Sequence, residues 1–131
     1  MAGWGTGSFE NEDAVNWIAE LPSIDSDGLK KILVRAADES DYLEAPDASI
    51  VIAAAEVIAA LKGAPAERAP REVMDWVGKS KTAWPPDSNQ LAIRAVERVR
   101  RNSELKDLWL QAEGLNEWIA SLQELQNRLA S

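Results

Sequence analysis

The chain has 131 residues, of which 46% are hydrophobic and 27% are charged, and its 22 acidic and 14 basic side chains give a net charge of −8. This length and balance fit one globular domain spanning residues 1–131. The absence of cysteine and histidine excludes disulfides, thiol catalysis, the commonest general base and the commonest transition-metal ligand. An excess of acidic residues also disfavours nucleic acid, because its phosphates bind Lys and Arg.

Apolar residues recur at helical spacing through the first part of the chain. Asn11 is a suitable N-cap for a helix over residues 12–21, and Pro22 is expected to end it. A second helix is expected from Ser26 or Asp27 to residue 37. Its apolar stripe consists of Leu29, Ile32, Leu33 and Ala36.

A third helix is expected over residues 46–62, and it is the most apolar of all. Only Glu56 interrupts the apolar stretch from Ile50 to Ala60. A helix that is apolar nearly all round belongs in the middle of a bundle. Gly63 is suited to the position that follows the helix, where a positive φ is common.

Three more helical segments are expected in the remainder. A short one covers residues 71–77 and stops at Gly78, and the next begins at Asp87 or Ser88. The apolar residues of that next helix are Leu91, Ala92, Ala95, Val96 and Val99.

The last segment, residues 103–130, shows the clearest heptad-like pattern, although Gly114 lies within it and marks a kink or a break. The seam consists of Leu105, Leu108, Ala112, Leu115, Ile119, Leu122, Gln126 and Leu129. No segment alternates as a strand does. The sequence therefore predicts an all-α, single-domain bundle of five to six helices with a long C-terminal helix.

The N-terminus carries a distinctive motif of large aromatic residues, glycines and acids. The positions concerned are Trp4, Gly5, Gly7, Phe9, Glu10, Asn11 and Asp13. This pattern resembles a bacterial family called domain of unknown function 4259, whose members begin with Trp-Gly-x-Gly-x-Phe, an acidic residue, and Asn or Ser. The extra small residue at Ala2 or Gly3 departs from that pattern. The resemblance implies an all-helical bacterial protein and implies no activity.

Two interpretations of this motif remain open. The favoured one is structural: the aromatic residues close one end of the bundle, and the glycines permit close backbone approach. The other is a binding site made of Trp4, Gly5, Gly7, Phe9, Glu10, Asn11, Asp13 and Trp17. Acids at the start of the first helix already occupy the positive end of its dipole, which argues against an anionic ligand.

Carboxylates are the only plausible catalytic or metal-binding groups. An acidic loop contains Asp38, Glu39, Asp41, Glu44 and Asp47. Their oxygens suit Ca²⁺ or Mg²⁺, but the spacing is not that of an EF-hand, so a solvated loop without metal or cofactor is favoured. Glu56, in its apolar helix, is expected to lie at the edge of the bundle or in a structural ion pair, with Arg94 and Arg98 as candidate partners, rather than to act as an acid or base.

Charge is unevenly distributed along the chain, and this guides the functional hypotheses. Residues 1–62 contain 12 acids and 4 bases, a net charge of −8, whereas residues 63–131 contain 10 of each. The arginine stripe of Arg94, Arg98 and Arg101 is expected to pair with these acids within the chain or across a dimer. The favoured function is a non-enzymatic interaction module that uses its acidic N-terminal half to bind a basic protein partner, for example an immunity or antitoxin-like protein that masks a basic nuclease.

Two alternatives to the interaction module stay open. One is a carboxylate enzyme or divalent-metal binder centred on Glu10, Asp13 and Glu56. The other is a structural homo-oligomer joined through the last helix. The N-terminal residues lack the basic region and apolar run of a signal peptide, and no apolar run is long enough to span a membrane, so a cytoplasmic location is expected.

Overall fold

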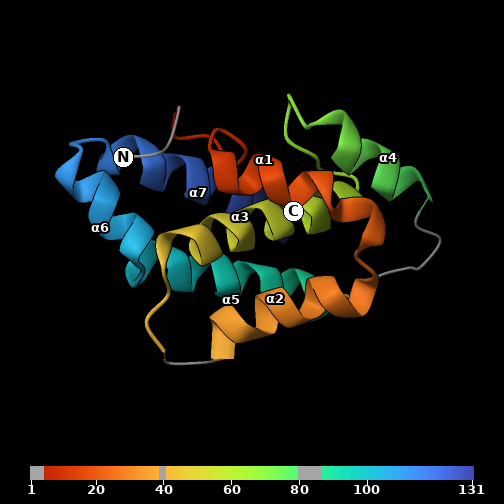
Figure 1. The fold of residues 1–131 in the computed structure, drawn as a ribbon, viewed down its shortest axis with the longest axis horizontal. Coiled ribbons are helices and arrows are strands. Elements are labelled where there is room, and N and C mark those ends of the chain that lie inside the picture. Colours follow the sequence, from red (N-terminus) through yellow and green to blue (C-terminus); the bar gives the residue numbers. More distant parts are fainter. Residues whose placement is uncertain (1–4, 39–40, 80–86) are drawn as a thin grey trace.

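A computed structural model describes residues 5–38, 41–79 and 87–131, and over these ranges it is helical without strands (Figure 1). The described helices are α1 (Glu12–Ala19), the 3₁₀ helix η1 (Leu21–Ser23), α2 (Ser26–Asp38), α3 (Ala45–Leu61), α4 (Arg71–Lys79), α5 (Asp87–Arg101), α6 (Glu104–Gln111) and α7 (Leu115–Ala130). The predicted all-α class is confirmed. The described part contains seven α-helices, one more than the upper limit of the prediction.

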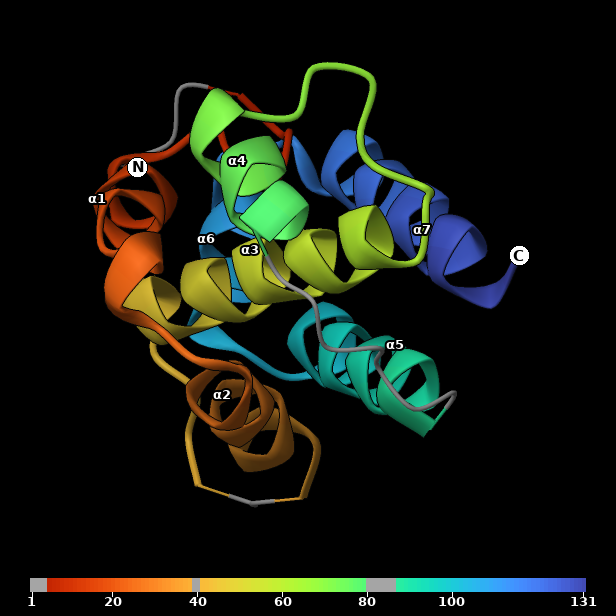
Figure 2. The same cartoon turned by 90° about the vertical axis from the view of Figure 1, so that its right-hand side faces the viewer.

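Helix α3 lies at the centre of the molecule, with the other α-helices arranged around it (Figure 2). Nearly every residue from Ala48 to Ala60 is buried. The apolar residues that cover the whole circumference of this helix explain its position, because each face needs an apolar neighbour. Its many alanines leave room for surrounding backbones to approach closely. The predicted central helix is thus confirmed, beginning one residue earlier and ending one residue earlier than expected.

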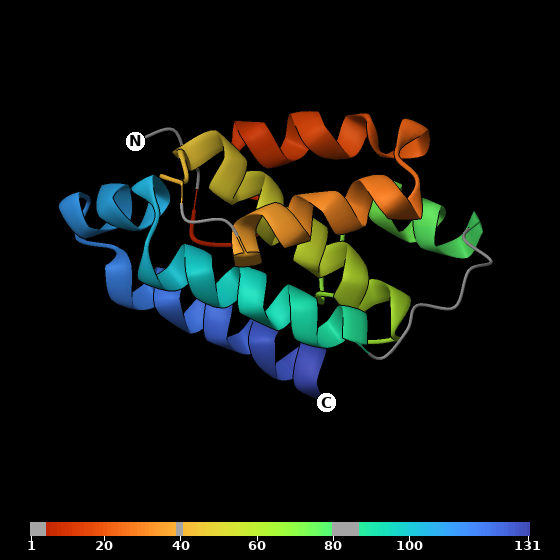
Figure 3. The same ribbon diagram turned by 90° about the horizontal axis from the view of Figure 1, so that it is seen from below.

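Helix α5 forms a second centre of contact. It packs against α2, α3 and α7, and Figure 3 shows α2 and α7 on either side of it. All five apolar residues predicted for it are buried, namely Leu91, Ala92, Ala95, Val96 and Val99. Helices α3 and α5 therefore share the core on which the remaining helices rest.

The expected long C-terminal helix is wrong, because the chain breaks after Gln111 and turns into a separate α7. Glu113 has a positive φ of 62°. A Cβ atom added at Gly114 would lie 2.7 Å from Cε3 of Trp109, so a larger residue there would collide with a rigid, buried ring. The glycine thus allows the indole to fill the inside of the corner. Among the residues of the predicted seam, Ala112 is exposed.

Smaller differences concern helix ends. Helix α1 ends at Ala19, because Leu21 starts the short 3₁₀ helix η1 instead. Helix α4 continues through Gly78 to Lys79. Gly63 has the expected positive φ, 95°, after α3. Among the described helices, none is both long enough and apolar enough to cross a membrane.

Candidate functional site

The N-terminal motif forms a loop whose order is set by hydrogen bonds to its own side chains. Asn11 is the N-cap of α1, and its Oδ1 accepts a hydrogen bond from the backbone N–H of Ala14 over 2.8 Å. Such a bond satisfies one of the free N–H groups at a helix start. The predicted cap is confirmed, and it fixes where the loop of residues 5–10 meets the helix.

Glu10 folds back over the two glycines of the motif. Its Oε1 accepts a hydrogen bond from the Gly7 N–H at 3.0 Å, and the Glu10 N–H donates to the Gly7 carbonyl at 3.1 Å. A Cβ atom added at Gly5 would lie 2.6 Å from Glu10 Oε2, and one added at Gly7 would collide with Oε1 of the same carboxylate. The glycines therefore permit the close approach expected from the sequence, and the group that approaches is the Glu10 carboxylate.

Ser8, at the middle of this loop, ties it to the central helix. Its hydroxyl donates to Oε2 of Glu56 over 2.7 Å. The same carboxylate receives two bonds from Arg128 on α7, from Nη1 to Oε1 at 2.8 Å and from Nη2 to Oε2 at 2.9 Å. This fork-to-fork geometry is the strongest form of ion pair between side chains. Three segments far apart in the sequence thus meet at one carboxylate.

The ion pair lies inside the molecule. The Glu56 side chain is 4% exposed and that of Arg128 is 17% exposed. Burial lowers the pKa of Arg128, but hydrogen bonds to Glu56 and Glu124 outweigh this effect and raise that pKa above its ordinary value. Arg128 therefore carries its positive charge throughout the accessible pH range.

Of the two structural interpretations of Glu56, the ion pair is confirmed and the position at the bundle edge is wrong, because the side chain is buried. The candidate partners, Arg94 and Arg98, are also wrong. Arg94 binds Asp38 on α2 at 3.1 Å. Arg98 donates from Nη1 to the carbonyl of Ala36 at 3.0 Å, and from Nη2 to the carbonyl of Asp41. Both arginines point from α5 toward the end of α2, away from the Glu56 face of α3.

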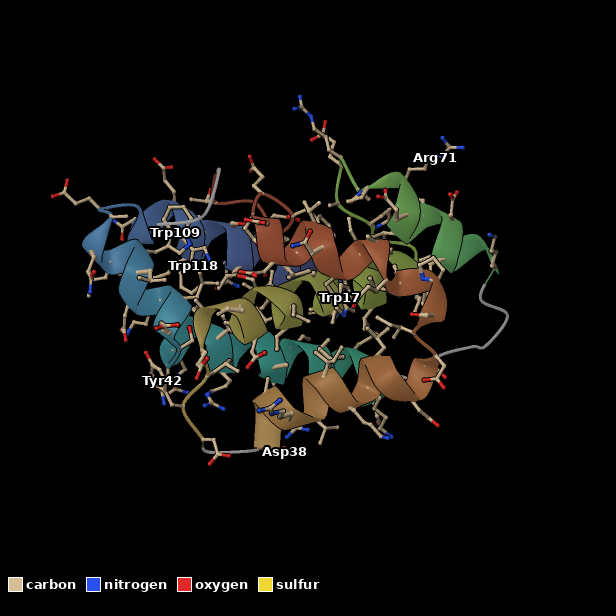
Figure 4. All side chains as sticks on the ribbon, in the orientation of Figure 1. Trp17, Asp38, Tyr42, Arg71, Trp109 and Trp118 are labelled. Atoms are coloured by element: carbon tan, nitrogen blue, oxygen red, sulfur yellow. The ribbon has the colours of Figure 1, made fainter. Side chains whose placement is uncertain are left out.

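A small cavity lies beneath the N-terminal loop, between that loop and the α6–α7 corner. Its volume is about 50 Å³. The lining includes the loop, the start of α1, one face of α3 and the two tryptophans of the corner, which lie close together in Figure 4. Its residues are Gly5, Thr6, Gly7, Ser8, Asn11, Asp13, Ala45, Ser49, Ile52, Leu105, Leu108, Trp109, Trp118 and Leu122.

The cavity is mostly apolar and contains two polar features that need an explanation. Ser49 is only 3% exposed, and its hydroxyl makes no hydrogen bond with any residue of the described ranges. Buried hydroxyls are normally bonded, so this one is unsatisfied. Asp13 is the acidic residue of the lining, and no arginine or lysine lies in the lining over the described residues. These features make the cavity the best candidate for a small-ligand site.

The structure brings together part of the predicted binding site. Gly5, Gly7, Asn11 and Asp13 line the cavity. Phe9 packs against the core, and Glu10 covers the glycines from outside. Trp17 is buried against α2 and α3 and lies apart from the two corner tryptophans (Figure 4). Trp4 lies outside the described residues.

Sequence reasoning missed Ser8, Ser49 and Arg128, as well as the two tryptophans as cavity walls. Ser8 sits inside the motif, but a serine between Gly7 and Phe9 carries no signal that it reaches a distant carboxylate. Trp109 and Trp118 were visible as large residues beside the predicted seam. The break at Gly114, which turns them toward one another, was the signal for their meeting.

The acidic loop does not form a cation site over the described residues, where no group of three or more carboxylates is arranged to hold a metal ion. Asp38 pairs with Arg94, and Asp41 and Glu44 are exposed. Asp47 lies at the start of α3, beside Trp17. Glu39 lies outside the described residues. Tyr42, within this loop, is 62% exposed, and partial desolvation together with the nearby Glu104, Asp107 and Glu44 raises its pKa.

A second surface feature is a groove between α4 and the segment that joins η1 to α2. Its lining consists of Pro22, Asp25, Ser26, Glu72, Asp75, Trp76 and Lys79. The half-buried Trp76 is held in place because its indole N–H donates to the Ile24 carbonyl over 3.1 Å. The groove therefore presents one fixed aromatic ring among three carboxylates and one ammonium group. It will be called the α4 groove.

The fold and the two sites define an all-helical protein built around a central apolar helix, with a small cavity at one end and an acidic groove on its surface. The model of the family "Domain of unknown function (DUF4259)" matches residues 3–121, so the chain belongs to this family and the expected family membership is confirmed. Comparisons with curated proteins and with solved structures gave no significant match.

Proposed function

We propose that this protein is a non-enzymatic interaction module that binds a basic protein. The observation that carries the proposal is the α4 groove, where Asp25, Glu72 and Asp75 surround the ring of Trp76. A guanidinium or ammonium group of a partner is attracted both by these carboxylates and by the face of the indole. Tryptophan is also the residue type on which interface binding energy most often depends.

The charge of the whole chain supports the same choice of partner. A net charge of −8 speeds the encounter with a basic protein and repels acidic ones. The groove is locally acidic, since its three acids are opposed by Lys79 in the lining and by Arg71, whose Nε lies 3.8 Å from Oδ2 of Asp75. By contrast, α2 exposes Lys30, Lys31 and Arg35 on its outer face, so the acidic N-terminal half is not a uniform surface.

An immunity or antitoxin-like role, in which the chain masks a basic nuclease, is the concrete form of this proposal. Masking needs no catalytic group, which suits a chain without histidine or cysteine. We expect the partner to be a bacterial protein located in the cytoplasm.

The test starts with the tagged protein in native bacterial lysate, eluted by a salt gradient, with the retained chains identified by mass spectrometry. The retained basic chain is then purified and titrated by calorimetry. We expect 1:1 binding that weakens as salt rises. Glu72→Lys should weaken binding about tenfold, because it reverses a charge at the groove.

Glu117→Lys is the matched control, since Glu117 is likewise an exposed acid in the first turn of its helix, α7. It makes the same change in net charge away from the groove and should alter the affinity by about twofold or less. Equal losses in the two variants would show that only net charge matters. Failure to retain any basic chain at low salt would refute the proposal.

A further inference from the structure

The cavity beneath the N-terminal loop has the composition of a site for a small cation. Its walls are largely aromatic and aliphatic, from Trp109, Trp118 and the leucines of α6 and α7. Asp13 supplies a carboxylate, and no basic side chain in the described lining neutralises it. An apolar pocket whose acid faces no basic side chain in the described lining, and whose walls include two indoles, favours a positively charged ligand over a neutral or negative one.

The unsatisfied hydroxyl of Ser49 gives independent evidence of a missing polar partner. Ser49 lies in the second turn of the central helix and is 3% exposed. A buried hydroxyl without a partner destabilises the folded state, because it has lost its hydrogen bonds to water. Because its hydroxyl can accept as well as donate, it suits an N–H of a bound ammonium group.

The two charged groups nearest the loop are already occupied and do not compete for this role. The Glu56 carboxylate accepts bonds from Ser8 and Arg128. The Glu10 carboxylate accepts from the Gly7 N–H outside the cavity. Asp13 and Ser49 are therefore polar residues of the lining that remain available to a ligand.

We propose that this cavity binds the ammonium end of a small alkylamine, with Asp13 as the counter-ion, Ser49 as the hydrogen-bond acceptor and the indoles of Trp109 and Trp118 as the walls. The volume of about 50 Å³ limits the enclosed part to a few heavy atoms. A primary ammonium on a short chain meets this limit. The proposal does not depend on the α4 groove or on a protein partner.

The test is a titration with n-propylammonium chloride, followed by the indole N–H signals in ¹H–¹⁵N NMR spectra. Trp109→Phe and Trp118→Phe assign the two relevant signals. We expect saturable shifts of these two signals, while the Trp17 signal stays in place because that ring lies against α2 and α3. n-Propanol and propionate are the matched probes, and both should bind about tenfold more weakly or not at all, because they lack the positive charge.

Two variants connect the binding to the named groups. Asp13→Asn should weaken n-propylammonium binding about tenfold, because it removes the counter-ion. Glu12→Gln is the control, since Glu12 is the exposed acid next to Asp13 in the same first turn and is absent from the lining. Ser49→Ala should weaken binding by a smaller factor, since it removes one neutral hydrogen bond.

The spectra themselves report whether each variant is folded, so a folding defect is not mistaken for lost binding. Absence of saturable shifts with n-propylammonium would overturn the proposal and leave a cavity that holds only water. Equal binding of n-propanol, or equal losses in the Asp13 and Glu12 variants, would overturn the assignment of a cation and of Asp13.

Discussion

Two acid–arginine pairs of this molecule have the same chemistry and opposite surroundings. Glu56 and Arg128 join α3 to α7 in the interior, with side chains 4% and 17% exposed. Glu97 and Arg100 lie on consecutive turns of α5, with about a third of each side chain in contact with water. Both pairs are bidentate. The pairs differ in burial and in whether they join two helices or two turns of one helix, so the comparison shows how surroundings decide the role of an ion pair.

Because the inner pair is buried, each of its two charges needs the other, and removing one leaves an unpaired charge inside the protein. A lone carboxylate inside an apolar helix cannot be hydrated, so losing Arg128 leaves Glu56 with only the hydroxyl of Ser8. At the outer pair, water replaces a lost partner at little cost. The inner pair also fixes the position of the N-terminal loop, because Ser8 binds the same carboxylate. The outer pair stabilises α5. Because Gln126 of α7 also donates a hydrogen bond to Glu97, the pair contributes to the contact between α5 and α7 as well.

The largest effect is expected from Arg128→Met, which keeps the length of the side chain and removes its charge. We expect the free energy of unfolding to fall by about 3–5 kcal/mol, as for other buried pairs broken on one side. Urea denaturation followed by circular dichroism measures it. Glu124→Gln is the control, because Glu124 also accepts from Arg128 but is 61% exposed. Its loss should cost less than about 1 kcal/mol.

The double variant Glu56→Met/Arg128→Met separates unpaired charge from lost packing. If the cost of Arg128→Met comes from the isolated carboxylate, removing both charges should recover most of the lost stability. A double variant that is as unstable as Arg128→Met would show instead that the shape of the pair, not its charge, holds α7 against α3.

Sequence alone identified Glu56 as the exceptional residue, but it could not identify the partner. A helix that is apolar all round has no polar face to show how it is oriented in the bundle. Nothing in the sequence of α3 therefore indicates which neighbouring helix faces Glu56. Arg94 and Arg98 were attractive because they repeat at helical spacing, yet that face of α5 turns toward α2. Arg128 stood alone in the last turn of the chain and gave no periodic signal.

The helices themselves were more predictable than their junctions. Asn11 and Gly63 act through local backbone chemistry, and both behave as the sequence indicated. The sequence predicted either a kink or a break at Gly114. Which of the two forms depends on the ring of Trp109, five residues earlier in the chain, which packs against this glycine. The cavity depends on that choice, since an unbroken helix would not turn Trp109 and Trp118 toward the N-terminal loop. Hydrophobic periodicity therefore predicts the helices but does not predict a site that forms where the chain turns between two of them.

A smaller effect is expected at the outer pair, and it depends on pH. The hydrogen bond from Arg100 is the main cause that lowers the pKa of Glu97, with Gln126 adding to it and partial burial opposing it. A carboxyl whose pKa is lower in the folded state stabilises that state fully above its unfolded pKa, about 4.3. This stabilisation is lost as the pH falls through the folded pKa.

Arg100→Met should therefore reduce stability by less than about 1 kcal/mol at neutral pH and by progressively less in acid. Urea denaturation of both proteins from neutral pH down to the acid range measures the difference. A difference that stays constant across this range would show that the methylenes of Arg100 matter rather than its bond to Glu97.

The smallest effect is expected for Arg94 and Asp38, which extend the comparison to a pair more than half exposed on both sides. Arg94→Met should change the free energy of unfolding by about 0.3 kcal/mol, and the change should vanish in about 1 M NaCl, where screening acts within a few ångströms. Arg128→Met should keep nearly its full effect in the same salt, because ions do not reach the buried carboxylate. If both variants lost their effect in salt, Glu56 would have to be accessible to solvent. The N-terminal loop, which Ser8 attaches to that carboxylate, would then open readily, and the cavity beneath it would be exposed rather than enclosed.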